Sequence, residues 1–350
     1  MKGLISIITF LIVGILTAFY IGFGFPDATE STAVDVEIVG LHEKFTLKFS
    51  HVVAENTPKG LAAAYFAELV SEKTGGWVEI QVYPNGVLYD AQEEFDALKN
   101  GEVQMIAPAF SEVTVRDPKW IVMDLPYLFD SEAKVEQAFE GSVGELLLKS
   151  IEREGFKGLA FWDNGFKQLT NNVRPIILPE DVHGLLFRVM PSEALFKTYQ
   201  TVGAAAVTIS FNDVYNALRD GVIDGQENTL SNIYSKGFYQ QQQYMTITNH
   251  NYLGYVVLID PEFWRTLPEV YQSSILEAME EVTAWQRHHA RELNKEMLER
   301  IAVGSNIEIY EQTEEERAVW RKALKPLYDV YEPIIGKELL DEFAKLQNDY

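Results

Sequence analysis

The chain has 350 residues, of which 47% are hydrophobic and 23% are charged, as is typical of a folded globular protein. Its formal net charge of −23 excludes nucleic acid and anionic lipid as principal partners, because phosphate binding needs clustered Lys and Arg. The absence of cysteine excludes disulfides, thiolate catalysis, Cys-ligated zinc and iron–sulfur clusters.

The first residues have the composition of an export segment. Lys2 precedes a nearly unbroken apolar run at residues 4–25, and small residues follow it. The run is long enough to span a bilayer, so two interpretations of residues 1–26 stay open: a cleaved signal peptide and a retained membrane anchor. Both place the chain outside the cytoplasm, in the periplasm or on the outer face of the cytoplasmic membrane. Residues 27–43 are acidic without periodicity, which predicts a linker.

Strand and helix patterns alternate in the next part of the chain. Period-two segments predict strands, and apolar residues at helical spacing predict helices between them. The order is strand 46–52, helix 59–73, strand 78–83, helix 91–99 and strand 103–109. This β-α-β-α-β succession predicts a parallel sheet with helices on its faces.

The same theme returns in the middle of the chain. A helical stretch comes first, and further strands and helices follow it. The helices are expected at 132–154, 192–202 and 212–220, and the strands at 158–162, 185–190 and 205–209. These segments predict a second α/β lobe.

A β-rich segment at 248–260 is expected to cross between the lobes. One helical pattern then runs over residues 269–302, about three times the usual helix length, so it could serve both lobes as a shared spine. The C-terminal part predicts a strand and two helices, at 306–310, 313–327 and 333–347.

These elements place the lobe boundaries at the expected crossings. Lobe I comprises residues 44–165 plus about 254–293, and lobe II comprises 166–253 plus about 294–350. The predicted fold class is therefore α/β, with two lobes and a long helix that spans both.

Motifs of catalysis are missing from the sequence. No G-x-G-x-x-G, P-loop, H-E-x-x-H or G-x-S-x-G is present. Only His288 and His289 are close together, and adjacent helical residues point about 100° apart, which does not make a metal-ligand pair. We therefore expect neither an enzyme nor a bound metal or cofactor.

Three polar residues in apolar or glycine-bounded segments point to anion binding. Lys167 follows a predicted strand, and Arg188 lies inside the apolar strand 185–190. A buried Arg must either be paired internally or face a ligand, and the sequence favours neither. Asn228 ends a polar segment, 221–229, that predicts a turn before a helix, where Asn228 is either a helix cap or a ligand contact.

The sequence resembles the DctP family of substrate-binding proteins of tripartite ATP-independent periplasmic (TRAP) transporters. The likeness runs from about residue 45 to 340 and depends on several motifs in the same order. They are FSHVVAENTP at 49–58, DLPYLF at 124–129, GFK at 165–167, GLLFR at 184–188, FNDVY at 211–215, DGQEN at 224–228 and HNYLGY at 250–255.

The resemblance implies a periplasmic-binding-protein-like fold whose lobes close over an organic acid in the cleft between them. It implies that Arg188 forms a salt bridge with a substrate carboxylate, that Asn228 helps to hold it and that Phe211 lines the pocket. The family's second cationic position is usually Arg, and here it is Lys167. Thr229 stands where the family commonly has Pro.

The runs at 161–168, 252–255 and 51–59 look most like the branch that binds C4-dicarboxylates, which implies succinate, fumarate or malate. Lys167 is the first candidate for the second carboxylate. Glu55, Asn56 and Lys59 are further candidates, although residues 56–58 also suit a helix cap. Residues 108–111 are expected to face the cleft, and Tyr252 and Tyr255 are either core residues or contacts.

The resemblance implies TRAP membrane subunits as partners. An alternative is a co-sensor that presents its ligand-bound form to a membrane sensor kinase, which needs the same site. A remote alternative is a hydrolase or lyase that acts on an organic acid.

Overall fold

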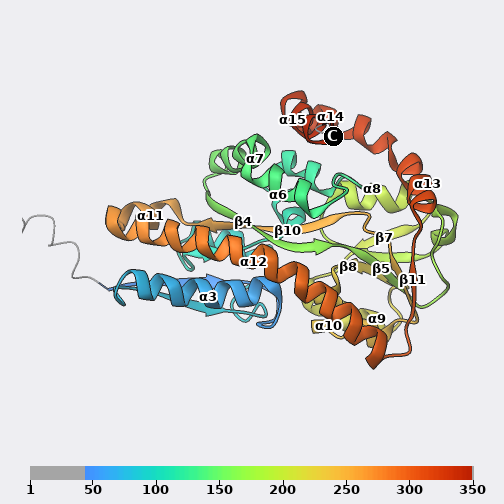
Figure 1. The fold of residues 1–350 in the computed structure, drawn as a ribbon, viewed down its shortest axis with the longest axis horizontal. Coiled ribbons are helices and arrows are strands. Elements are labelled where there is room, and N and C mark those ends of the chain that lie inside the picture. The colour runs from blue at the N-terminus through green and yellow to red at the C-terminus, as the bar shows by residue number, and fades with distance from the viewer. Residues whose placement is uncertain (1–43, 349–350) are drawn as a thin grey trace, which may run out of the picture. The chain divides into compact units, whose positions relative to one another are not determined.

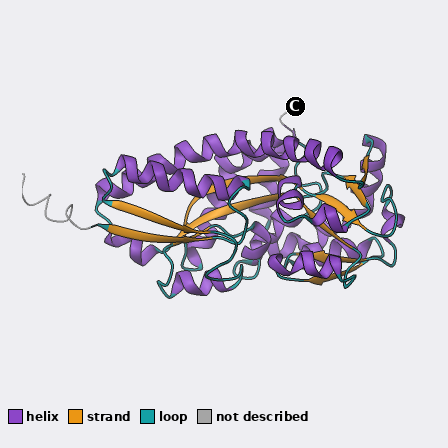
Figure 2. Cartoon of the chain, turned by 90° about the horizontal axis from the view of Figure 1, so that it is seen from below, coloured by secondary structure: helices purple, strands orange, loops and turns teal. Residues whose placement is uncertain are grey.

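The protein was analysed as a computed structural model, which describes residues 44–348. The predicted export segment and linker, residues 1–43, lie outside the described residues. Within residues 44–348 no helix combines the length and the apolar character that a membrane span needs. The described chain forms two sheets, and helices lie on either side of the strands (Figure 2).

The first sheet has five strands in the order β2-β1-β3-β10-β4. Their bounds are β1 Phe45–Ser50, β2 Val78–Tyr83, β3 Met105–Ile106, β4 Lys157–Phe166 and β10 Tyr252–Ile259. β1 pairs in parallel with β2 and β3, which confirms the predicted parallel sheet for this part of the chain. β10 enters antiparallel between β3 and β4.

Local signals in the sequence set the bounds of α3 (Pro58–Lys73), which follows β1. The Thr57 side chain accepts a hydrogen bond from the Gly60 amide, and Pro58 occupies the first turn, where no intrahelical donor is lost. After the helix, Gly75 and Gly76 adopt positive φ angles of 60° and 82°, which turn the chain into β2.

The second sheet has six strands in the order β11-β9-β5-β8-β6-β7. Their bounds are β5 Gln168–Asn171, β6 Leu186–Val189, β7 Ala205–Thr208, β8 Gly225–Asn228, β9 Tyr244–Ile247 and β11 Glu308–Glu311. The sequence prediction of a turn at 221–229 was wrong for its second half. Those polar residues form β8, a central strand between β5 and β6, because buried neighbours supply their hydrogen-bond partners.

Helices cover both sheets. The helices of the first lobe are α4 (Glu93–Lys99), α5 (Phe110–Val113), the short helix η1 (Pro118–Asp124), α6 (Glu132–Glu140) and α7 (Ser142–Arg153). The predicted helix at 132–154 is thus interrupted at Gly141. The second sheet is joined by α8 (Glu193–Thr201), η3 (Phe211–Asp213), α9 (Val214–Arg219), α10 (Leu230–Ser235) and η4 (Phe238–Gln241).

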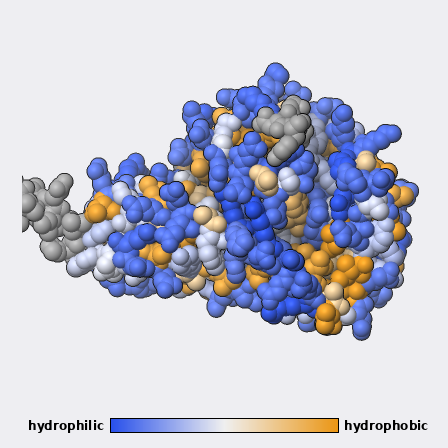
Figure 3. All heavy atoms as spheres, in the orientation of Figure 1, coloured by the Kyte–Doolittle hydropathy of each residue, from blue (hydrophilic) through white to orange (hydrophobic). Residues whose placement is uncertain are grey.

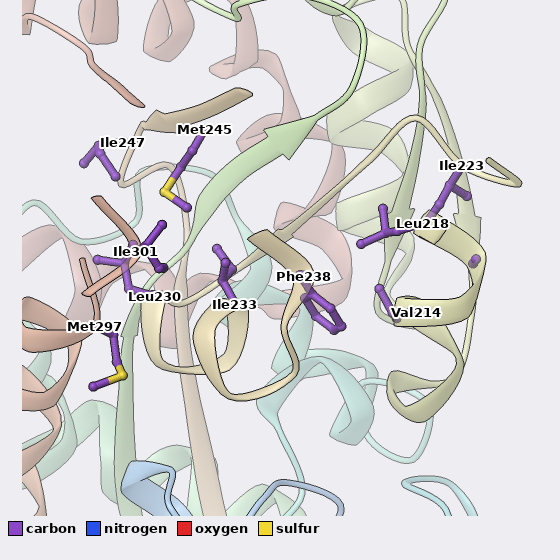
Figure 4. Packing of buried hydrophobic residues seen from close by; sticks show 11 residues of the cluster. Val214, Leu218, Ile223, Leu230, Ile233, Phe238, Met245, Ile247, Met297 and Ile301 are labelled. Carbon is purple, nitrogen blue, oxygen red and sulfur yellow. The ribbon is translucent and has the colours of Figure 1, made fainter. Parts of the chain in front are cut away.

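The long helix α12 (Glu269–Gly304) follows the short α11 (Pro261–Thr266), and the predicted spine is confirmed (Figure 1). Its N-terminal part packs on α3 and β4. Its C-terminal part contributes Met297 and Ile301 to the core of the second lobe, beside Ile233 and Met245 (Figure 4).

The remaining helices, α13 (Glu314–Leu324), α14 (Pro326–Ile335) and α15 (Lys337–Asn348), close the chain. α14 packs on η1 and α8, whereas α15 packs on α6 and α7. The chain passes from β4 to β5 at Lys167, and it returns from β9 to β10 over residues 248–251. The two lobes are therefore linked by two short crossings, by α12 and by the C-terminal helices, while the predicted lobe boundaries stay a prediction.

Candidate functional site

A small cavity lies between the two lobes. The first lobe contributes the ends of its strands and the helices that follow them, and the second lobe contributes β6, η3, β8 and α10. The lining residues are Val52, Val53, Lys59, Ala91, Glu94, Pro108, Ala109, Glu112, Arg188, Met190, Phe211, Asn228, Asn232, Leu253 and Tyr255. Ligands of α/β sheets bind at such strand ends.

Arg188 projects from β6 into this cavity with only 2% of its surface exposed. Its Nε donates a hydrogen bond to the Ile209 carbonyl oxygen at 2.9 Å. Within residues 44–348 no carboxylate lies at ion-pair distance from it, so the alternative of an internal pair finds no partner there. Burial lowers the pKa of Arg188, and Glu112 and Glu227 oppose this shift.

Asn228 ends β8 and lines the same cavity. Its Oδ1 accepts hydrogen bonds from the Thr229 amide at 3.1 Å and from Asn232 Nδ2 at 2.8 Å. These bonds hold the side chain in place just before α10. Thr229 occupies the N-cap position of α10, so the cap alternative for Asn228 was wrong and the ligand contact stays a prediction.

Lys59 brings a second cation to the cavity, from the first turn of α3 in the other lobe. It is 1% exposed, its Nζ donates to the Ala107 carbonyl oxygen at 2.7 Å, and it lies 3.9 Å from the centroid of the Tyr255 ring. Burial lowers the pKa of Lys59 to about 8, against the attraction of Glu94 and Glu112.

Lys167 does not line the cavity. It is buried at the crossing between the sheets, where its Nζ lies 2.8 Å from Glu227 Oε1. His250 Nε2 lies 2.8 Å from Glu227 Oε2, and the Tyr199 hydroxyl donates to the same oxygen at 3.0 Å. Burial alone would raise the pKa of Glu227, but Lys167 and His250 hold it well below its usual range. The structure thus gives the Lys167 ammonium an internal partner.

The remaining predicted residues separate into two groups. Phe211 lines the cavity and packs edge-on against Phe238, with ring centroids 5.9 Å apart. Glu55 and Asn56 are exposed in the turn before α3 and are not lining residues. The structure therefore brings together Arg188, Asn228, Phe211 and Lys59 and leaves out Lys167, Glu55 and Asn56.

Two carboxyl groups in the cavity escaped the sequence analysis. Glu94 comes from α4 and Glu112 from α5, and both are buried. The expected cleft position of residues 108–111 was a signal for Glu112, which follows one residue later. No such signal marks Glu94, because the sequence of its helix has the pattern of an ordinary amphipathic helix. Tyr255 also lines the cavity, and its hydroxyl accepts a hydrogen bond from Asn164 Nδ2 at 2.6 Å.

Contacts between the lobes hold the cavity closed. Asn212 Nδ2, from η3, donates to the Asn85 carbonyl oxygen of the first lobe at 3.1 Å. Thr114 Oγ1 donates to the Pro191 carbonyl oxygen at 3.3 Å. The outer surface is mostly hydrophilic on the face that Figure 3 shows, in keeping with the high charge of the chain. The two cations, Arg188 and Lys59, thus lie inside the cleft of a protein whose overall charge is negative.

Two lobes closed over a small buried cavity with convergent cations define a solute-binding protein. A family model described as bacterial extracellular solute-binding protein, family 7 (DctP), matches residues 49–333. The chain belongs to this family, which confirms the resemblance in its sequence. The family is one of solute-binding transport proteins that act outside the cytoplasm.

Similar proteins cover nearly all of the chain. The C4-dicarboxylate-binding protein DctB of Bacillus subtilis is 45% identical over 349 residues, covering 100% of both chains. A TRAP periplasmic solute binding protein from Sulfurospirillum deleyianum, solved with bound succinate, is 38% identical with a TM-score of 0.82, covering 88% of this chain and 100% of that one. A Shewanella oneidensis counterpart, also with bound succinate, is 37% identical with a TM-score of 0.84, covering 87% and 99%.

Proposed function

We propose that the chain captures a C4-dicarboxylate (succinate, fumarate or malate) outside the cytoplasm and delivers it to the membrane subunits of a TRAP transporter. The observation that carries this proposal is the convergence of Arg188 and Lys59, one from each lobe, on one buried cavity. Two cations that approach from opposite walls suit a ligand with a carboxylate at each end. The succinate bound by two similar proteins supports the same ligand class.

In this binding mode Arg188 and Asn228 take one carboxylate. The guanidinium fork can bond both oxygens in parallel, which an ammonium cannot do. Lys59 takes the second carboxylate, and Phe211 packs against the short carbon chain. Lys59 thus replaces Lys167 as our candidate for the second cation, because the Lys167 ammonium is bonded to Glu227.

Closure of the lobes completes capture. Water leaves the cleft, and each charge-assisted hydrogen bond becomes stronger in the lower local dielectric. Release to a transporter requires moderate affinity, so we expect a dissociation constant of roughly micromolar, about −8 kcal/mol.

Calorimetric titration of the purified, ligand-free protein without residues 1–43 tests the ligand class. The panel is succinate, fumarate, malate, a monocarboxylate and a sugar acid. We expect saturable binding for the three C4-dicarboxylates only. Binding confined to the monocarboxylate would keep the role of Arg188 and exclude the proposed ligand class. No binding to any of the five compounds would contradict the proposal.

Three further parts of the proposal have their own measurements. Residues 1–26 direct export, and the mass of the exported protein distinguishes a cleaved signal from a retained anchor. The ligand is bound without turnover, so prolonged incubation leaves it unchanged, and a new product would favour the hydrolase or lyase instead. Uptake that requires the TRAP membrane subunits separates transport from presentation to a sensor kinase.

A further inference from the structure

The cavity holds two carboxyl groups beside its two cations. Glu94 and Glu112 line it together with Lys59 and Arg188, and all four side chains are buried. If all four are ionised, the charges of the lining residues cancel. A dianion that enters then has no net positive charge to compensate it, in a site from which water is excluded.

Glu94 is the less well compensated of the two carboxylates. The Ser50 hydroxyl donates a hydrogen bond to its Oε1 at 2.8 Å. The charged groups that act on it come from three neighbouring segments: Lys59 from α3, Glu112 from α5 and Asp90 from the turn before α4. His51, at the end of β1, is a neighbour of Lys59. Burial raises the pKa of Glu94 to about 7, opposed by Lys59 and Ser50 and reinforced by Glu112 and Asp90.

The neighbours of Glu94 leave it as the group that can change its charge near neutral pH. Burial lowers the pKa of His51 to about 3, so this imidazole stays neutral. The Lys59 ammonium is divided between the Ala107 carbonyl oxygen and the Tyr255 ring, and its own pKa of about 8 keeps it mostly protonated at pH 7.

Two neighbouring groups favour the ionised form of Glu112, although burial raises its pKa as well. The Gln92 amide donates a hydrogen bond to its carboxylate. The positive charge of Arg188 also favours the ionised form. Glu112 therefore serves as a fixed counter-charge that Arg188 shares with the ligand.

We propose that Glu94 takes up a proton when the dicarboxylate dianion binds, and that the resulting carboxylic acid donates a hydrogen bond to the ligand. This inference rests on the proposed function and adds that ligand binding is coupled to the uptake of one proton. The proton comes from solvent water or buffer and stays on the Glu94 carboxyl oxygen until the ligand leaves. Protonation removes one negative charge from the cavity and converts a repelling acceptor into a donor.

The sign of the pH dependence follows directly. At pH 6 Glu94 is already mostly protonated in the free protein, so binding takes up little. Above about pH 7 the free protein carries the ionised form and the bound protein the acid. Affinity then falls as the pH rises, by at most about tenfold per pH unit for one proton.

Calorimetry in two buffers of different ionisation enthalpy measures this proton. With succinate at pH 7, the midpoint of Glu94, we expect uptake of about half a proton per ligand by Glu94 and little by Lys59, whose pKa of about 8 keeps it mostly protonated at that pH. Glu94→Gln keeps the shape and the acceptor for Ser50 but cannot titrate, so uptake at pH 7 should fall to the small share taken by Lys59, and the dissociation constant should barely change between pH 6 and pH 7. Glu112→Gln is the matched variant within the cavity and should retain uptake. Glu145→Gln, on the exposed surface of α7, should behave as the unchanged protein.

The outcomes distinguish this inference from the function on which it rests. Tight binding without proton uptake in the unchanged protein overturns the inference and leaves the function intact. Uptake that survives in Glu94→Gln and vanishes in Glu112→Gln also overturns it, since the proton then belongs to Glu112. Failure of the unchanged protein to bind any C4-dicarboxylate at any pH removes the proposed function itself.

Discussion

Arg188 is held by its strand and by one hydrogen bond from Nε to the Ile209 carbonyl oxygen. That arrangement leaves both terminal nitrogens of the guanidinium for a second partner. Glu112 compensates this buried cation only from beyond ion-pair distance, and the ligand carboxylate can supply the direct partner. Burial of Arg188 therefore lowers the stability of the free protein, and ligand binding offsets this loss.

Replacing Arg188 with Ala should reduce affinity for succinate by about 3 kcal/mol or more, roughly 100-fold or more. The fold should remain, because the side chain pairs with no carboxylate in residues 44–348. Calorimetry measures the affinity and thermal unfolding measures the stability. Arg219→Ala, which removes an exposed Arg from the same lobe, is the control. Near-normal affinity of Arg188→Ala would contradict its assignment to the site.

The sequence alone points to Arg188 as a candidate site residue, but it does not reveal the partner of Lys167. An Arg inside an apolar strand is conspicuous in one line of sequence. The partner of Lys167 is Glu227, 60 residues later, and it comes within reach because β5 pairs antiparallel with β8. No local pattern encodes that register, so the distance between the two charges could not be predicted.

At the scale of elements, a buried polar cluster fixes the crossings between the two sheets. Glu227 on β8 accepts hydrogen bonds from Lys167 and Tyr199 and is bonded to His250. The Lys167 amide also donates to the Asn251 carbonyl oxygen at 2.8 Å, which joins the outgoing crossing to the returning one. This cluster ties β4–β5 to β9–β10 at the point where the lobes must move relative to each other.

The change Lys167→Met should lower the free energy of unfolding by about 3–5 kcal/mol, because it leaves Glu227 buried without its cation. Urea unfolding measures this loss. The double variant Lys167→Met/Glu227→Gln should recover much of it, since the uncompensated charge is gone. A Lys167→Met protein of normal stability that fails to bind succinate would instead support the ligand contact that the family resemblance implies.

The fold itself was more predictable than the site. Thr57–Pro58 and Gly75–Gly76 are sequence signals for the start and the end of α3, and α12 shows an unbroken helical pattern. The strand β8 could not be foreseen, because Gly225–Asn228 is polar and its hydrogen-bond partners come from β5 and β6. Tertiary pairing thus overrides a local preference for a turn.

On the scale of the whole molecule, α12 connects the cores of the lobes. Its Gln286 accepts from the Asp163 amide at 2.8 Å on the edge strand β4. Eight residues later, Asn294 donates to the Asn164 carbonyl oxygen and accepts from the Ser231 amide at 2.9 Å. One side chain therefore bonds both β4 of the first lobe and α10 of the second.

The opposite side of the cleft depends on weaker contacts. Asn212 donates to the Asn85 carbonyl oxygen at 3.1 Å, and Lys236 Nζ orients it by donating to Asn212 Oδ1 at 2.9 Å. Neither Asn212 nor Asn85 lines the cavity. The contact can form only after the lobes have met, so it stabilises the closed form without taking part in the first encounter with the ligand.

Replacing Asn212 with Ala should therefore speed ligand release and leave association unchanged. Loss of one hydrogen bond costs about 0.5–1.5 kcal/mol, which corresponds to roughly 2- to 13-fold faster dissociation. Stopped-flow binding of succinate measures both rates, and Asn306→Ala, on an exposed loop, is the control. Slower association with an unchanged dissociation rate would place Asn212 in the encounter step and contradict its role in closure. The predicted result would instead make the closed lifetime adjustable at a residue that never contacts the ligand.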